Sequence, residues 1–150
     1  MNEPAADDAF TPLPLPSGRT ERTILFAMRR MAMHGIRDAS AAWLMLDLFS
    51  ARFIEPLVML RAFMFKLSSA ARHPLRMASC CAPFMTEDEA LILTVLRQAS
   101  NEPELAEQAL ARLTRNQRPA KALSAATRFA RAAAEPTVRF GISAGPPPAR

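Results

Sequence analysis

The sequence has no tyrosine and only four glycines, two cysteines and two histidines in its 150 residues. Tyrosine is enriched in strands and glycine in the tight turns of hairpins, so the absence of tyrosine and the low glycine content, beside abundant alanine and leucine, argue against an all-β protein. Two cysteines cannot form a disulfide framework, and they exclude a zinc site of four thiolates. The sequence lacks a basic and apolar leader, and no run of about 20 residues is apolar enough to span a membrane. We therefore expect a cytoplasmic protein with reduced thiols and no membrane span.

Proline divides the chain, because most of the 13 prolines lie near its two ends. Proline lacks the backbone N–H and has a fixed φ angle, so neither end is suited to a long helix or to a sheet. This pattern predicts disordered tails at residues 1–20 and 135–150 around one helical domain at residues 21–134. The alternating Pro–Leu run at residues 12–16 is compatible with polyproline II, but we expect a solvated tail.

Half of the residues are hydrophobic, and their spacing follows the period of amphipathic helices. The predicted helices span residues 21–34, 39–53, 56–72, 87–99, 101–114 and 119–134. Together they predict an all-α fold, a compact bundle of five to six short helices. Asp38 and Asn101 are expected to cap the second and fifth helices, and Thr86 with Glu89 predicts a capping box at the fourth.

The second predicted helix carries large apolar residues almost all round its axis, Trp43 among them, so we expect it at the centre of the bundle. A short connection to the third helix predicts an antiparallel hairpin. Asp47 would then be buried, which is costly without a partner. Arg61, set between Val58 and Phe65 on the third helix, is its expected partner in a structural ion pair. The alanine-rich sixth helix has little apolar area to bury and is expected to be the least firmly docked.

The first predicted helix has a basic side opposite its apolar arc. This side carries Arg22, Phe26, Arg29, Arg30 and Met33. Apolar residues between arginines are typical of surfaces that contact a protein or a nucleic acid, so these five residues form the predicted partner-binding site. Scattered exposed apolar residues are also normal on a monomer, and that interpretation stays open.

Charge is unevenly distributed along the chain, whose formal net charge is +5. Acidic residues gather in the fourth and fifth predicted helices, whereas arginine and lysine dominate from Arg112 onward. We expect the basic sixth helix to lie over the two acidic helices. The alternative is a free basic C-terminal arm that contacts phosphate, as in nucleic-acid-associated proteins.

Cys80 and Cys81 have the clearest chemical potential, as a thiol site for redox sensing or for a soft metal held with His34 or His73. Adjacent cysteines wrap a metal poorly, and neither lies at a predicted helix start, so we expect structural, buried or half-buried thiols. No metal site and no cofactor is predicted. The sequence has no phosphate-binding glycine loop and no hydrolase or metalloprotease motif, which indicates a non-enzymatic protein.

Six segments of the sequence resemble a known family. They read RRMA at residues 29–32, HG at 34–35, DA at 38–39, PLVMLRAFM at 56–64, CC at 80–81 and MTEDEA at 85–90. In these segments, within residues 21–100, the chain resembles an uncharacterised alphaproteobacterial family of short helical proteins, a domain of unknown function. The resemblance implies a bacterial cytoplasmic protein and no known activity, so no catalytic residue follows from it. Family members are richer in cysteine near position 80, and this departure weakens a thiol role.

The sequence as a whole favours a small, non-enzymatic interaction or regulatory module whose unknown protein partner binds the first helix. The alternative is a nucleic-acid-associated protein that uses the same side and the basic C-terminal arm. A thiol or metal-linked sensor at the adjacent cysteines is the third hypothesis.

Overall fold

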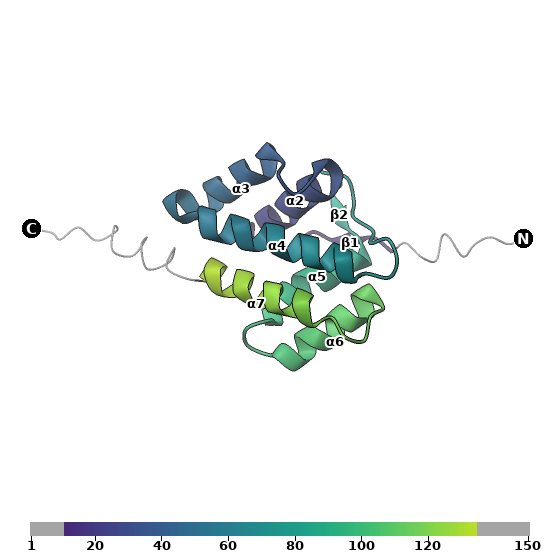
Figure 1. The fold of residues 1–150 in the computed structure, drawn as a ribbon. Coiled ribbons are helices and arrows are strands. Elements are labelled where there is room, and N and C mark those ends of the chain that lie inside the picture. Colours follow the sequence, from purple (N-terminus) through teal and green to yellow (C-terminus); the bar gives the residue numbers. More distant parts are fainter. Residues whose placement is uncertain (1–10, 135–150) are drawn as a thin grey trace, which may run out of the picture.

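The computed structural model describes residues 11–134, which Figure 1 shows as layers of helices. The helices in this part of the chain are α2 (Arg19–His34), α3 (Ala39–Phe49), α4 (Ile54–Ala70), α5 (Glu87–Gln98), α6 (Pro103–Thr114) and α7 (Ala120–Ala134). The remaining elements are a 3-10 turn between α3 and α4, η1 (Ser50–Arg52), and two short strands, β1 (Leu13–Pro14) and β2 (Phe84–Met85). The predicted all-α fold is confirmed.

Helix α4 crosses the middle of the molecule, with α2 and α3 on one side and α5, α6 and α7 on the other (Figure 1). Its most extensive helix contact is with α7, while α5 packs on α6 and α2 packs on α3. The inner faces meet in one core cluster, whose members include Leu25, Met28, Leu60, Phe63, Ile92, Leu110 and Phe129. The helices therefore bury one face each, as amphipathic helices of a bundle do.

Local signals set several helix ends. Asp38 caps α3 by accepting a hydrogen bond from a backbone N–H at 3.0 Å, as predicted. At α5 the Thr86 hydroxyl accepts from the Glu89 N–H and the Glu89 carboxylate accepts from the Thr86 N–H, both at 3.0 Å, which confirms the capping box. The predicted cap at Asn101 is wrong, because α6 begins at Pro103 and no side chain of the described residues caps it. Proline at the start of a helix has no N–H that needs a partner.

The N-terminal prolines do not prevent strand pairing, contrary to the predicted N-terminal tail. Strand β1 pairs antiparallel with β2, and Pro14 lies opposite Phe84. Proline is tolerated in an edge strand, where its missing N–H faces away from the partner. Residues 11–20 therefore belong to the fold. The rest of the predicted tails, residues 1–10 and 135–150, lies outside the described residues.

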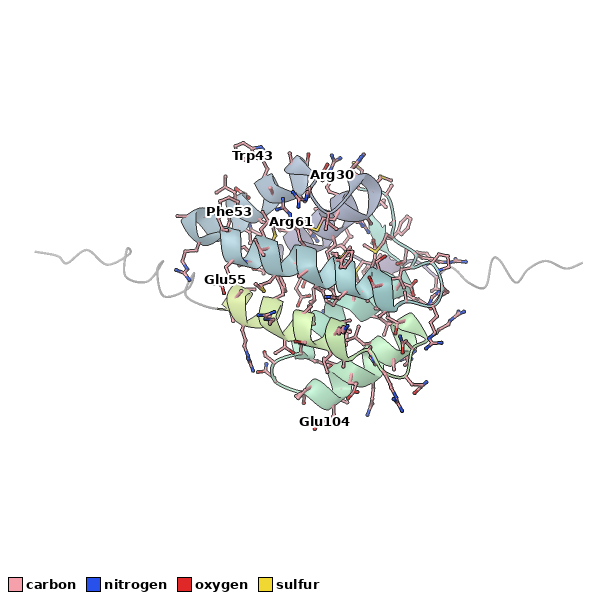
Figure 2. All side chains as sticks on the ribbon, in the orientation of Figure 1. Arg30, Trp43, Phe53, Glu55, Arg61 and Glu104 are labelled. Carbon is pink, nitrogen blue, oxygen red and sulfur yellow. The ribbon has the colours of Figure 1, made fainter. Side chains whose placement is uncertain are left out.

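Helix α3 is not the centre of the core, so the prediction for Trp43 is wrong. The helix buries Ala41, Met45 and Phe49, which recur every four residues, and it packs far more on α2 than on α4. Trp43 is 69% exposed, and Figure 2 shows it pointing away from the bundle. A helix with apolar residues all round its axis can bury any of several faces, and the packing on α2 decides which one is buried.

Helix α7 is well docked, contrary to the expectation for a helix with few large apolar residues. Its residues Ala122, Ala125, Ala126 and Phe129 are buried. The helix lies side by side with α4 in Figure 1, and this is the most extensive contact between described helices. Small side chains let two helices approach closely, so close packing of the backbones compensates for the small number of large residues on α7.

Candidate interaction surface

The predicted partner-binding side of the first helix is largely engaged in contacts within the molecule. Arg29 is the clearest case, because its side chain has no exposed surface. Its Nε and Nη2 donate to the Glu89 carboxylate at 2.8 and 3.0 Å, and its Nη1 donates to the Ala82 carbonyl at 3.0 Å. The assignment of Arg29 to a partner-binding site is therefore wrong. The segment before α5, which includes β2, covers this side of α2.

Glu89 completes a buried hydrogen-bond network that joins distant parts of the chain. Besides the Arg29 guanidinium, its carboxylate accepts the backbone N–H groups of Ala78 and Thr86 at 3.0 Å each. The Thr86 hydroxyl donates to the Arg76 carbonyl at 2.7 Å. A buried ion pair needs this degree of hydrogen bonding to offset the loss of water. The network holds the connection between α4 and α5 against α2, and its role is structural.

The other residues on this side of α2 differ in their exposure and in their hydrogen bonds within the molecule. Arg30 forms two hydrogen bonds of 3.1 Å with Asp38, and these hydrogen bonds are the main cause that holds the pKa of Asp38 below its ordinary value. Arg22 is exposed but donates to a backbone carbonyl of the N-terminal segment at 3.1 Å. Phe26 is half-buried and Met33 is exposed. The five predicted residues therefore do not form one free surface.

The predicted ion pair between Asp47 and Arg61 does not form. Asp47 pairs with Arg19 at 2.9 Å, and both of these side chains are open to water. The Arg61 Nε donates to the Ile36 carbonyl at 2.9 Å and so ties α4 to the connection between α2 and α3. The prediction assumed that α3 is buried on all sides and that Asp47 therefore needs a buried partner. The Asp47 carboxylate is exposed instead, so it needs none.

The two cysteines are free thiols, and the expectation of at least half-buried thiols is correct for Cys80 but wrong for Cys81, which is exposed. The Arg30 Nη1 lies 3.8 Å from the Cys80 Sγ, so one residue of the predicted partner side meets one of the predicted thiol site. The His73 Nε2 lies 2.9 Å from the Leu113 carbonyl instead. Within the described residues, no three His, Cys, Asp or Glu side chains gather to hold a metal ion. The thiol site stays a hypothesis.

A row of exposed apolar side chains runs along the outer face of α4. Ile54, Val58 and Phe65 are 56%, 45% and 55% exposed. Their spacing of four and then seven residues places them on one side of the helix, opposite the buried Leu60. The sequence-based prediction missed this row because it set Val58 and Phe65 around a buried Arg61. The available signal is that apolar residues occupy more of this helix than one buried face requires.

Cations border the Phe65 end of this row, where α7 begins beside α4. Lys66 of α4, Arg118 just before α7 and Lys121 in its first turn line a recess of about 500 Å³. The Lys66 ammonium lies 5.8 Å from the centre of the Phe65 ring, so Lys66 joins the edge of the apolar row to the recess that it lines. This end of the row is therefore both apolar and positively charged.

Two further cations border the Ile54 end of the row. Arg128 and Arg131 of α7 line a recess of about 280 Å³ together with Glu55, which Figure 2 shows at the end of α4 next to α7. In the part of the chain that the structure describes, none of these five cations forms an ion pair. We call the following set the α4–α7 surface: Ile54, Glu55, Val58, Phe65, Lys66, Arg118, Lys121, Arg128 and Arg131.

The position of α7 also corrects the expected pairing of opposite charges. The helix packs mainly on α4, although it also contacts the acidic helices α5 and α6. Between residues 11 and 134, its cations form no ion pair with an acidic side chain. Burial of its alanine and phenylalanine face directs the arginines outward, so packing rather than charge decides how α7 is placed.

A family of unknown function (DUF6628) matches residues 4–143 of the chain. The chain belongs to this family. The match extends well beyond residues 21–100, and it contains the whole α4–α7 surface, which is therefore part of the DUF6628 domain. No curated protein and no solved structure matches this DUF6628 chain. The expected membership in a family of unknown function is confirmed, and it assigns no activity.

Within residues 11–134 of the DUF6628 domain, no helix is both long enough and apolar enough to cross a bilayer.

Proposed function

We propose that this DUF6628 protein is a non-enzymatic interaction module that binds a protein partner through the α4–α7 surface. The proposal depends on one observation, the row of Ile54, Val58 and Phe65 on the outer face of α4. Apolar side chains framed by charged ones are typical of protein–protein contact regions. The α4–α7 surface takes the place of the α2 side that the sequence favours.

Two features support binding as the role of this surface. Helix α4 has other helices packed on both sides, so it presents the row on a rigid element. The buried charges of Arg29 and Glu89 are satisfied by each other and by the backbone, which favours a structural role over a catalytic one. We also propose a regulatory role for it, and a location in the cytoplasm of an alphaproteobacterium, as the family resemblance implies.

Affinity capture with three forms of the full chain tests the proposal: the natural sequence, Val58→Lys and Met33→Lys. Val58 and Met33 are both exposed apolar residues on helices, so lysine at either position is expected to leave the fold intact. Circular dichroism and thermal unfolding check this. We expect the natural form and Met33→Lys to capture a protein that Val58→Lys does not capture. The purified partner should likewise bind the natural form and Met33→Lys more tightly than it binds Val58→Lys. Capture that does not depend on Val58 would contradict the proposal.

Association with nucleic acid is the second candidate function, because the five cations of the α4–α7 surface have no ion-pair partner among the described residues. Binding through phosphates is strongest at low salt, where a gel shift with duplex and single-stranded oligonucleotides tests it. A shift that Lys121→Glu weakens would support this function. The absence of any shift at low salt would exclude it.

A further inference from the structure

We infer that the partner of the α4–α7 surface is an acidic amphipathic helix, with an apolar stripe and carboxylates along one edge of that stripe. This inference rests on the proposed function and adds the chemistry of the partner. It follows from the spacing of the apolar row, from the side of the row on which the cations lie, and from the charge that a second copy of the chain would bring.

The apolar row suits a second helix laid along α4. Ile54 and Phe65 are eleven positions apart in one helix, which corresponds to about 16 Å, or three turns of a partner helix. A partner helix can present its own apolar side chains over this length at the same spacing. An extended peptide fits less well, because the backbone groups along the middle of α4 are hydrogen-bonded within the helix and strand addition needs a free edge.

The cations lie on one side of the row, along the contact between α4 and α7. The Lys66 ammonium lies 5.8 Å from the centre of the Phe65 ring, and Lys66 lines the larger recess. Glu55, the neighbour of Ile54, lines the smaller recess with two arginines. Carboxylates along one edge of a partner helix would therefore lie over both recesses while its apolar stripe covers the row. Charge pairs at the border of an interface set the orientation and register of the partner.

A second copy of the chain does not satisfy this surface. In an antiparallel pairing of two α4 helices, Glu55 of one copy would lie near Lys66 of the other, because both residues border α7. However, each copy would bring its own Lys66, Arg118 and three α7 cations to the same border, so each copy contributes five cations and one carboxylate. Like charges facing each other across an interface are unfavourable, so the partner carries the opposite charge.

Nucleic acid and an anionic bilayer fit less completely. Phosphates would use the cations, but the aliphatic side chains of Ile54 and Val58 do not stack on bases as aromatic side chains do. A bilayer surface accepts both apolar and cationic groups, but it does not fill the two recesses that lie beside the row. Both ligands enter the test as alternatives.

Fluorescence polarisation with the full chain and designed peptides tests the inference. The acidic probe is a helical peptide of about 18 residues, or five turns, with leucines at the spacing of the row and glutamates along one edge. A lysine probe carries lysine in place of each glutamate, and a scrambled probe has the acidic composition without the helical pattern. Vesicles of phosphatidylglycerol with phosphatidylcholine and a single-stranded oligonucleotide are tested beside them.

We expect the acidic probe to bind at least about tenfold more tightly than the lysine and scrambled probes. The double variant Lys66→Glu/Lys121→Glu should weaken the acidic probe by about tenfold and tighten the lysine probe. Val58→Lys should weaken the acidic probe. The matched control Arg37→Glu changes an exposed cation on the α2–α3 connection and should leave all binding unchanged. Circular dichroism confirms that each variant is folded.

Equal binding of the acidic, lysine and scrambled probes would overturn the inference. Val58-dependent binding to the vesicles or the oligonucleotide that is tighter than binding to the acidic probe would overturn it in favour of that ligand. If no probe binds while a captured protein still depends on Val58, the inferred partner is wrong and the proposed function stands. If no captured protein depends on Val58 either, both are wrong.

Discussion

At the scale of single residues, the surroundings of a charge decide its role, as two arginines show. Arg29 is held by Glu89 with both side chains fully buried, whereas Arg97 pairs with Glu21 at the surface. The shortest distance is 2.8 Å in both pairs. Loss of one member of a buried pair leaves a charge without water, whereas an exposed charge returns to solvent. The two pairs therefore differ in energy although their geometry is the same.

Arg29→Met is expected to lower the free energy of unfolding by about 3–5 kcal/mol, because it leaves the Glu89 carboxylate buried without its cation. Urea unfolding at neutral pH measures the change. The matched control Arg97→Met removes an equally short pair from the surface and should cost less than about 1 kcal/mol. Similar losses in both variants would contradict a buried Arg29.

Stability in acid depends in part on Asp38, whose pKa the Arg30 side chain holds below its ordinary value. The unfolded chain therefore takes up this proton at a higher pH than the folded protein does. The ionised Asp38 stabilises the fold above its unfolded pKa of about 3.9, and this contribution is lost as the pH falls through the lower folded pKa.

We expect Asp38→Asn, which keeps a side chain able to cap α3, to reduce the fall in unfolding free energy between about pH 5 and pH 2. Denaturant midpoints measured across this range provide the test. The same dependence on pH in the variant and in the natural sequence would show that the Asp38–Arg30 pair does not contribute.

At the scale of elements, local signals and packing contribute differently. The capping box of Thr86 and Glu89 needs only residues three positions apart, so the sequence predicts where α5 begins. The buried face of α7 recurs with helical spacing at Ala122, Ala125, Ala126 and Phe129, but its docking depends on α4, which lies far away along the chain. Which face of α3 is buried depends in the same way on α2.

Phe129→Ala is expected to lower the free energy of unfolding by about 3–5 kcal/mol, because Phe129 is the large buried side chain of α7. The matched control Phe65→Ala changes the same residue type on the exposed face of α4 and should cost less than about 1 kcal/mol. Chemical denaturation measures both variants. A loss for Phe129→Ala no larger than that for Phe65→Ala would contradict the docking of α7.

At the scale of the whole molecule, α3 lies at the outside of the bundle and its tryptophan faces solvent. Trp43 is the only tryptophan, and the chain has no tyrosine, so intrinsic fluorescence reports mainly on this side chain. We expect acrylamide to quench the native and the unfolded protein to a similar extent. Trp43→Ala should change the free energy of unfolding by less than about 1 kcal/mol. A shielded, blue-shifted native emission would place α3 inside the bundle and contradict this structure.

Some features of the α4–α7 surface can be predicted from the sequence and others cannot. The basic character of α7 is visible in the sequence, and so are the apolar residues of α4. The sequence does not show that the cations of α7 and the apolar residues of α4 share one border, because this depends on α4 and α7 lying side by side. The sequence therefore points to a basic protein with a candidate binding side on α2, whereas the structure exposes an apolar and basic surface on α4 and α7 instead.

The sequence by itself determined the helical class, several helix ends and the excess of positive charge. These properties depend on composition and on residues three or four positions apart, which the chain brings together within one helix. The tertiary structure alone decided that Arg29 meets Glu89 across 60 positions, that Trp43 faces water and that residues 11–134 leave one face of α4 exposed. Each of these depends on which helix packs on which, and several packings can bury a similar apolar area from the same pattern.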